Sequence, residues 1–151
     1  MLGLTHIGFA LLCSSILKIR LTIFDVIGLA LFSILPDIDL PSSELGIILR
    51  PLSHKLLEHT THRGATHSLL FVLGILCPLR FLLPDFHLLA ALGLLSHLFL
   101  DMLTPVGIEF LWPIKLRLII LDAPVNTGSK ADYFIFLISS AIFIYSRISI
   151  G

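Results

Sequence analysis

The sequence predicts an all-α fold, a single polytopic membrane bundle of four to five short transmembrane helices over residues 1–151. The chain is 56% hydrophobic and only 13% charged, whereas a soluble domain carries about 25% charged residues. The mean hydropathy is +1.02, and the apolar residues gather in segments divided by polar or proline-containing stretches. A chain with so little charge cannot cover a water-facing surface, so the lipid bilayer is its expected partner.

Five apolar segments account for most of the chain, at residues 5–17, 22–36, 66–83, 86–103 and 131–147. Each is shorter than the ~20 residues that cross a bilayer upright. We expect flanking basic residues to snorkel and the bilayer to thin around them. Pro78 predicts a kink or an early end in the third segment, and four helices is the alternative count.

Local signals predict several helix boundaries. Thr22 and Asp25 have capping-box spacing at the start of the second segment. Pro36 ends that segment, because proline cannot continue the helical hydrogen-bond ladder. Thr66 is the expected cap of the third helix, and Pro84 opens the fourth. No basic residue precedes the first apolar run, which favours a retained membrane helix over a signal peptide.

Two stretches between the apolar segments are expected to be largely irregular. Residues 37–65 are polar by the standard of this chain and predict a loop with one short helix. Residues 104–130 contain prolines, glycines and Trp112, a composition typical of an excursion along the membrane interface.

Several function classes are disfavoured. The formal net charge is zero, so no electrostatic footprint for nucleic acid exists. The sequence contains no glycine-rich phosphate loop and no Gly-x-Ser-x-Gly motif, which argues against a serine hydrolase. Nothing in the sequence indicates an oligomeric state.

The ionisable residues of the apolar segments cluster at one face of the predicted bundle. If five helices alternate in direction, the start of the odd helices and the end of the even ones meet at the same face. Charged side chains at membrane depth are costly and usually mark function. Eight residues arrive at this face: His6, Asp37, Asp39, His62, His67, His97, Asp101 and Asp132.

His97 and Asp101 lie four residues apart, on one face of the fourth helix. This spacing lets an imidazole and a carboxylate reach one ion, which is the favoured interpretation; a polar pair that hydrogen-bonds within the bundle is the alternative. Asp37 and Asp39 lie between two prolines, where we expect an extended backbone. Both carboxylates are then available as metal ligands, or one orients a histidine from outside the ligand set; a plain Asp-rich turn is the alternative.

The densest run of histidines surrounds the start of the third segment. His62 in the loop and His67 on the first turn of the helix are expected to hold a metal, unless the loop is simply solvated. Arg63 between them is suited to clamp an anionic phosphate, or to face lipid headgroups. His6 is a weaker candidate ligand, supported by its position at the same face.

Four stretches resemble the YdjM-like family of bacterial inner-membrane proteins: Thr5-His6-Ile7-Gly8, LPDIDLPSS at 35–43, HRGATHSLL at 62–70 and SHLFLDMLTPVGIEFLWP at 96–113. The resemblance extends in order and spacing over nearly the whole chain. It implies a multi-pass protein of the cytoplasmic (inner) membrane and a metal-dependent hydrolase. The implied metal ligands are His6, Asp37, Asp39, His62, His67, His97 and Asp101.

These observations predict a membrane-embedded, metal-dependent hydrolase. Imidazoles mixed with carboxylates favour Zn²⁺, with Mn²⁺ or Fe²⁺ as alternatives, as one or two ions. A metal-activated water would attack a phosphoester, such as a phospholipid. Asp37 or Asp39 is expected to accept the proton, and Arg63 to hold the phosphate. A noncatalytic metal-binding scaffold, a metal-ion transporter and a bis-histidine haem protein are the alternatives.

Overall fold

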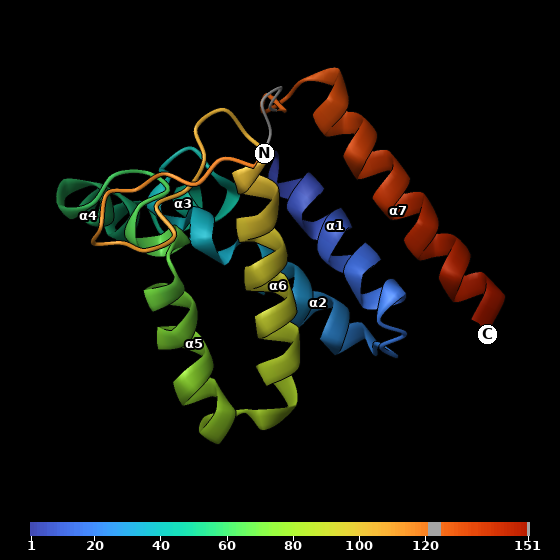
Figure 1. Ribbon diagram of the computed structural model, residues 1–151. Helices are drawn as coiled ribbons and strands as arrows, with labels where there is room; N and C mark the ends of the chain where they lie inside the picture. Colours follow the sequence, from blue (N-terminus) through green and yellow to red (C-terminus); the bar gives the residue numbers. More distant parts are fainter. Residues whose placement is uncertain (121–124, 151) are drawn as a thin grey trace.

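The computed structural model describes residues 1–120 and 125–150, and within them every regular element is a helix (Figure 1). The predicted all-α class is therefore confirmed for this part of the chain. In order, the elements are α1 (Gly3–Ile16), α2 (Ile23–Ile34), the 3-10 helix η1 (Leu35–Asp39), α3 (Glu44–Ile48), α4 (Arg50–His59), the 3-10 helix η2 (Ala65–His67), α5 (Leu69–Leu82), α6 (Pro84–Met102) and α7 (Lys130–Ile150).

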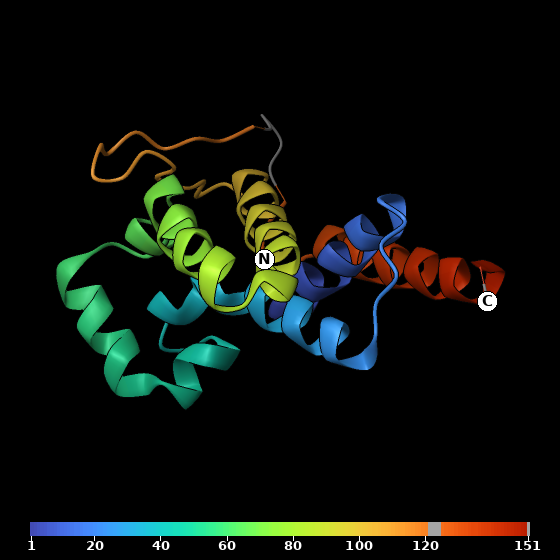
Figure 2. The same cartoon turned by 90° about the horizontal axis from the view of Figure 1, so that it is seen from below.

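The helix α6 lies at the centre of the bundle. It packs against α1, α2 and α5, whereas α7 packs on the outer side of α1 (Figures 1 and 2). The core beneath the site consists of Val72, Leu94, Leu98 and Ile108. The short helices α3 and α4 lie together beside the same end of α6 at which the chain begins (Figure 1).

The helix boundaries follow the predicted signals with one exception. The capping box of α2 is present, with reciprocal bonds between Thr22 and Asp25, and Pro84 occupies the first turn of α6. The prediction that Thr66 caps the third helix is wrong. Ser68 caps α5 instead, by accepting a hydrogen bond from the Phe71 amide. Thr66 is free for another role, because the chain from Ala65 to His67 forms the 3-10 turn η2 before α5 begins.

The stretch 37–65 is more regular than expected. It contains two short α-helices, α3 and α4, in place of one. The backbone at Asp37 and Asp39 is not extended, because both residues lie in η1, which continues directly from α2. Within 104–130, the described residues are irregular apart from an antiparallel bridge between Ile108 and Leu118; residues 121–124 of that expectation lie outside the described residues.

Two helices, α6 and α7, are long and apolar enough to cross a membrane. The helices α1 and α5 are apolar but have only 14 residues each. The expected four or five spans are therefore not established by helix length alone. At about 1.5 Å per residue, the 21 residues of α7 extend about 31 Å, close to the ~30 Å of a hydrocarbon core.

A glycine sets how closely α2 and α6 approach. A Cβ atom built at Gly93 would lie 2.8 Å from the Cβ of Phe32 and 2.9 Å from the backbone nitrogen of Ser33. Only glycine fits such a contact without moving the helices, and small residues commonly permit close crossings in membrane bundles. The crossing places Ser33 against the face of α6 that carries His97, one turn beyond Gly93.

Candidate metal centre

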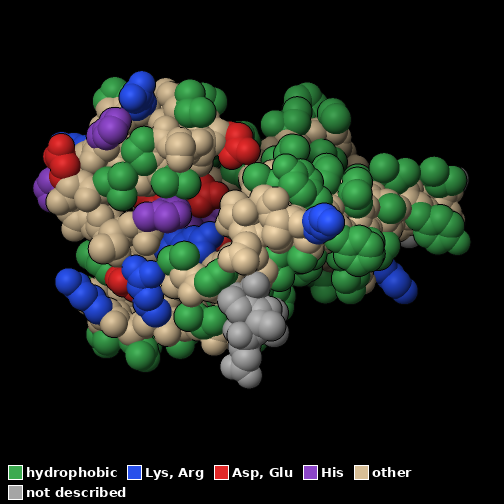
Figure 3. Space-filling view, turned by 90° about the horizontal axis from the view of Figure 1, so that it is seen from above, with side chains coloured by type: hydrophobic (Ala, Val, Ile, Leu, Met, Phe, Trp, Pro, Cys, Tyr) green, Lys and Arg blue, Asp and Glu red, His purple; other side chains and the backbone are tan. Residues whose placement is uncertain are grey.

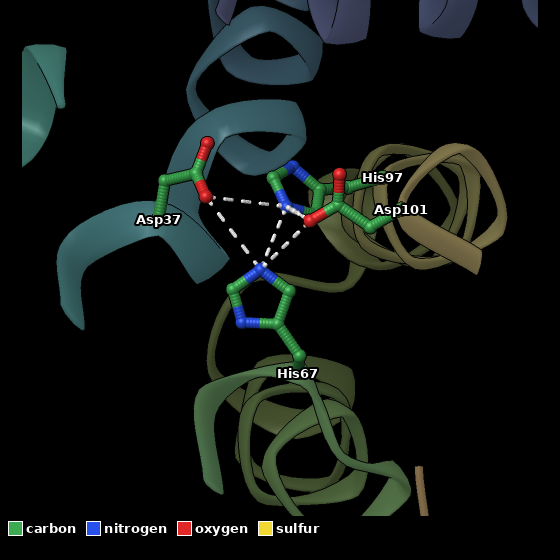
Figure 4. Close-up of side chains that lie close together, drawn as sticks. All are labelled: Asp37, His67, His97 and Asp101. Carbon is green, nitrogen blue, oxygen red and sulfur yellow. Dashed lines mark hydrogen bonds and ion pairs between the residues drawn. The ribbon is translucent and has the colours of Figure 1, made fainter. Parts of the chain in front are cut away.

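Two histidines and two aspartates meet at one end of the bundle. They come from three elements: Asp37 from η1, His67 from η2, and His97 and Asp101 from α6 (Figure 4). His67 Nε2 and His97 Nε2 are 3.1 Å apart. His67 Nε2 lies 3.5 Å from Asp37 Oδ1 and 3.3 Å from Asp101 Oδ2. His97 Nε2 lies 3.6 Å from each of the same two oxygen atoms.

These separations match the edges of a small tetrahedron. Four donors placed about 2.0–2.1 Å from one zinc ion are about 3.3–3.4 Å apart. Five of the six edges between the four donor atoms lie between 3.1 and 3.6 Å, and all the atoms lie within 4.8 Å of one another. A single divalent cation therefore fits among them.

Hydrogen bonds on the outer side of each imidazole determine which nitrogen faces the centre. His97 Nδ1 lies 2.7 Å from the carbonyl oxygen of Ser33, which can only accept, so Nδ1 carries the proton. Thr66 Oγ1 donates to Asp39 at 2.7 Å and therefore accepts from His67 Nδ1 at 3.0 Å. When both rings are in the neutral form that metal binding requires, each Nε2 has a lone pair directed at the other histidine. Such outer-shell contacts are typical of metal-binding histidines.

The Asp101 carboxylate has one oxygen atom without a hydrogen-bond donor, the one that faces the two histidines. Asp101 Oδ2 is buried and accepts no hydrogen bond within the described residues. Its other oxygen, Oδ1, accepts from Arg63 Nη2 at 3.1 Å and lies 2.9 Å from the amino group of Met1. Two imidazole nitrogens and two carboxylate oxygens thus converge in a buried space, and one cation could bind all four.

Arg63 is buried beside Asp101 at the edge of the centre. Its Nε lies 3.0 Å from Asp101 Oδ2, and the two groups form an ion pair. This contact lacks hydrogen-bond geometry, so Nε has no hydrogen-bond partner among the described residues. Nη1 donates to the hydroxyl of Thr104. Arg63 also has a positive φ of 65°, a conformation that costs energy for a residue with a side chain and marks a constrained position.

Asp39 organises the surroundings of the four donors. Its carboxylate accepts from the Thr66 hydroxyl, from the Arg63 backbone amide at 3.0 Å and from His62 Nδ1 at 2.9 Å. It thereby connects η1 to the loop that carries both Arg63 and His67. Asp39 and His62 therefore lie one layer outside the four donors, in the orienting position that was one of the two expectations for these aspartates.

His6 lies against the opposite side of the centre. Its ring stacks on that of His97 with 3.8 Å between centroids, and its Nε2 is 3.5 Å from Asp101 Oδ1. The side chain is fully buried, and neither ring nitrogen makes a hydrogen bond within the described residues. A histidine with this much unused bonding capacity is unusual in a buried site.

The carboxylates in the 3-10 turn η1 are held in the charged form. Burial raises the pKa of Asp37, but the imidazoles of His97 and His67 outweigh burial and hold the pKa below its usual range. Burial also raises the pKa of Asp39, but His62, His67 and Thr66 outweigh burial, so the pKa of Asp39 is lowered as well. Both are anions at neutral pH, as ligation of a metal or orientation of a histidine requires.

The structure brings all seven predicted ligands and Arg63 to one end of the bundle. Their roles as ligands or catalytic groups stay predictions.

Sequence reasoning missed Ser33, Thr66 and Thr104 as contributors to the centre. Thr66 precedes His67 directly but was interpreted as a cap, and the other two contact residues 64 and 41 positions away only because of the fold. Asp132 is buried nearby but bonds to the backbone of Leu2 and Gly128.

The centre lies close to one surface of the molecule. Seen from above, histidine, acidic and basic side chains gather around a hollow on this face, whereas the arm that extends to the right is covered largely by hydrophobic side chains (Figure 3). Among the four donors, only the side chain of Asp37 is measurably exposed, at 10%. Access from outside therefore reaches Asp37 first.

The comparisons with known proteins identify related sequences. A family model described as YdjM inner membrane protein matches residues 1–150. The chain is 37% identical over 120 residues to the Inner membrane protein YdjM of Escherichia coli (strain K12), and equally to that of Shigella flexneri; each match covers 75% of this chain and 60% of the relative.

A more distant relative is the Uncharacterized protein YvsG of Bacillus subtilis (strain 168), which is 35% identical over 105 residues. That match covers 68% of this chain and 65% of the relative. The chain thus spans less than two thirds of the length of these curated relatives. No solved structure matches the chain.

Proposed function

This chain belongs to the YdjM family of inner membrane proteins, and from that membership and the centre described above we propose that it is a membrane-embedded, metal-dependent hydrolase of phosphoester bonds. The observation that carries the proposal is the convergence of two imidazole lone pairs and two carboxylate oxygens at tetrahedral separations. These four atoms are all acceptors, so they repel one another unless a cation, or protons in its place, lies among them.

A multi-pass arrangement is part of this proposal. The helices α6 and α7 have the required length, and we place α1, α2 and α5 beside them as short spans with a locally thinned bilayer. Their outward faces support this placement, because large apolar side chains are exposed on every one of them: Leu4, Ile16, Ile27, Leu31, Leu70, Leu73, Leu95, Phe99, Phe134 and Leu137. Exposed apolar surface on this scale is typical of contact with lipid.

The ligand set divides into permanent and exchangeable members. Zinc sites with four protein ligands are usually structural, whereas catalytic sites keep one position for water. We assign His67, His97 and Asp101 as the permanent ligands, since their side chains are fully buried. Asp37 is the exchangeable ligand, because it alone has access to the outside. If water took the place of Asp37 at a bound ion, the Asp37 carboxylate would lie beside that water, could accept its proton and could return the proton to the leaving alkoxide oxygen.

The remaining residues would serve the reaction as follows. A zinc ion held by these residues would supply a coordinated water with a pKa of about 7 and would stabilise negative charge on phosphoryl oxygens. Arg63 keeps Asp101 in place and has unused N–H donors for a phosphoryl oxygen, since a guanidinium offers five. Asp37 is the more accessible proton acceptor of the two, because its side chain is 10% exposed, whereas Asp39 is fully buried and already accepts three hydrogen bonds.

An apolar groove that extends to the start of the 3-10 turn η1 supports a lipid as substrate. The groove has a volume of about 360 Å³ and is lined by Gly28, Leu31, Phe32, Leu35, Leu45, Leu49, Leu83 and Phe86. Leu35 begins the same 3-10 turn that carries Asp37. We propose that an acyl chain of the substrate occupies this groove, which would bring the headgroup phosphate toward Asp37. Zn²⁺ is the expected ion, with Mn²⁺ and Fe²⁺ as alternatives.

Two noncatalytic functions are the alternatives. A metal-binding scaffold is favoured if all four donors bind the ion permanently, because a closed site of this kind is typical of structural zinc. A metal-ion transporter would need ligands distributed along the membrane normal. Among the described residues the donors gather at one end of α6 instead, which argues against transport.

The test combines metal content with turnover in detergent-purified protein. We expect zinc to copurify, and hydrolysis of phosphatidylglycerol or p-nitrophenyl phosphate to stop with chelator and to return when zinc is added. Asp37→Asn should retain metal and lose turnover, whereas Asp101→Asn should lose both. Asp25→Asn is the matched control, because Asp25 is exposed and bonds only to Thr22.

Two results would count against the proposal. If Asp37→Asn loses metal as completely as Asp101→Asn and no ester is hydrolysed by the wild type, the site is a closed structural one. If the purified protein binds no divalent cation with or without added metal, the centre has another purpose. Cobalt substitution gives an independent readout, because the visible spectrum of an ion with an open position changes when azide is added.

A further inference from the structure

A second polar site lies at the end of α1 that is remote from the metal centre. A cavity of about 410 Å³ opens between the C-terminal end of α1 and the last turns of α7. Its lining residues are Ser15, Lys18, Ile19, Arg20, Ser146 and Arg147. His6 and Lys18 are separated by most of the length of α1, so this cavity shares no residue with the centre.

The cavity is strongly basic. Lys18, Arg20 and Arg147 supply three positive charges, and none of the residues that the structure describes as its lining is acidic. The first acidic residue of the chain, Asp25, follows soon after, but its carboxylate is used in the capping box of α2. Among the described residues none of these three cations makes an ion pair, and three such charges around one cavity create a potential that attracts an anion.

Contacts between α1 and α7 build the site rather than leaving loose surface charges. Arg147 Nη2 donates to the carbonyl oxygen of Ile19 at 3.0 Å, and the guanidinium lies over the ring of Phe143, 5.0 Å from its centroid. The hydroxyl groups of Ser146 and Ser15 are 2.9 Å apart. Arg147 is therefore held in position, while its other N–H groups stay free of these contacts.

Lys18 occupies a position at which a helix normally ends on glycine. Its φ is +55°, and the amides of Lys18 and Ile19 return to the carbonyl oxygens of Ser15 and Ser14, as in a Schellman-type helix end. Side chains are unfavourable in this left-handed conformation, and glycine avoids the strain. Lysine at this position supplies a positive charge to the cavity, which glycine could not do.

We propose that this basic pocket, Ser15 to Arg20 with Ser146 and Arg147, binds the phosphate of an anionic phospholipid headgroup at the membrane surface opposite to the metal centre. The proposal rests on the membrane placement of α1 and α7 and is independent of hydrolysis. Next to the pocket, Ile16, Leu17, Tyr145 and Ile148 expose large apolar side chains, which suit acyl chains below a bound headgroup. Basic pockets between membrane helices are a known mode of anionic lipid recognition.

Helix-dipole compensation is the competing explanation. Cations near the C-terminus of α1 interact favourably with the partial negative charge there, and that effect needs no ligand. The two explanations differ in what they predict for lipid dependence. A dipole contribution is the same in every bilayer, whereas a bound lipid stabilises the native state only when that lipid is present.

The test compares reconstituted protein in phosphatidylcholine vesicles with and without phosphatidylglycerol. We expect phosphatidylglycerol to raise the melting temperature of the wild type and to remain bound in native mass spectrometry. Lys18→Gln with Arg20→Gln should weaken retention of this lipid by about fivefold per charge removed. Lys18→Gly serves as the fold-preserving variant, because glycine relieves the left-handed strain while the side chain and its charge are removed. Arg80→Gln, at the end of α5 outside the pocket, is the matched control.

Three outcomes would overturn the proposal. The first is equal stabilisation of wild type and Lys18→Gly by phosphatidylglycerol, and the second is an equal loss of lipid binding in Arg80→Gln. The third is displacement of the lipid by millimolar inorganic phosphate, which would identify a soluble anion as the ligand. Retention of metal in Lys18→Gly is expected in every case, so failure here is distinguishable from failure of the hydrolase proposal.

Discussion

The helices α6 and α7 have similar length and hydropathy, yet they have opposite roles. Both pass the same test for a membrane span. Half of the α6 span is buried inside the protein, against 11% of the α7 span, and α6 contributes both His97 and Asp101 to the centre. α7 packs chiefly on α1 and exposes Phe134, Leu137 and Tyr145 among other apolar side chains.

The difference shows that hydropathy does not distinguish a helix that binds lipid from one that holds a site. The face of α6 that carries His97 and Asp101 is buried against protein, so these two side chains can be paired with groups from η1, η2 and α1. In the proposed membrane arrangement, a charge on the outer face of α7 would meet lipid and would have to move to the interface. The following predictions test this contrast, in order of decreasing expected effect.

The largest effect is expected from the two polar residues of α6. His97→Ala and Asp101→Asn should weaken zinc binding by more than the roughly 10–100-fold typical of an outer-shell partner. Asp101→Asn should also destabilise the protein by about 3–5 kcal/mol, because the buried guanidinium of Arg63 loses its counter-ion. Metal content and thermal unfolding measure both effects. Ser139→Ala, at a buried position of α7, should retain metal; a loss equal to that of Asp101→Asn would refute the division of roles.

Apolar truncation should separate the two helices next. Leu98 is 1% exposed and Leu137 is 61% exposed. Leu98→Ala should lower the free energy of unfolding by about 2–5 kcal/mol, since it leaves a cavity in the core under the centre. Leu137→Ala should change it by no more than about 0.5 kcal/mol. Denaturation in micelles measures both, and equal losses would mean that α7 is packed against protein in the membrane.

A methyl group at the α2–α6 crossing should have an intermediate effect. Gly93→Ala places a Cβ atom 2.8 Å from that of Phe32, and overpacking of this kind costs about 1–3 kcal/mol. We also expect weaker zinc binding, because the Ser33 carbonyl moves away from His97. Gly74 is the matched position, since a Cβ atom placed there would have no described neighbour within 4 Å. Gly74→Ala should be neutral or stabilising by up to about 1 kcal/mol.

The smallest effect concerns His67, which faces the α6 pair from η2. Burial lowers the pKa of His67, but its contacts with Asp101 and Asp37 outweigh burial and raise the pKa to about 9 in the metal-free protein, above the ordinary value of 6.5. The ion pairs of protonated His67 stabilise the metal-free protein. Their contribution to the free energy of unfolding is fully present below about pH 6.5 and is lost as the pH rises through 9. Metal binding has the opposite dependence, because the ion must displace the proton.

Zinc affinity should accordingly rise about tenfold per pH unit between about pH 7 and 9, with one proton released per ion bound. Isothermal titration in buffers of different ionisation enthalpy measures the proton release. An affinity that is constant over this range would mean that His67 is not a ligand. The α7 variant Ser139→Ala should reproduce the wild-type profile.

Much of the fold followed from local properties of the chain. Low charge and segmental hydropathy predict apolar helices, and the Thr22–Asp25 capping box and Pro84 define two of the helix starts. The candidate ligands were found because buried histidines and aspartates are rare in an apolar sequence and occur at helix ends that share one face. The spacing of residues along the chain does not determine the backbone conformation of a turn. The 3-10 turn at Asp37–Asp39 and the helix cap at Ser68 were therefore not predicted.

The sequence alone therefore determined which residues come to one end of the bundle. Only the tertiary structure divided them into four inward donors, an orienting pair of Asp39 and His62, and a stacked His6. That division depends on the contact at Gly93, on the hydrogen bond between Ser33 and His97 across 64 positions, and on the turn that directs Thr66 to Asp39. Such distances are set by how closely helices cross, because a shift of about one ångström changes which atoms can share an ion.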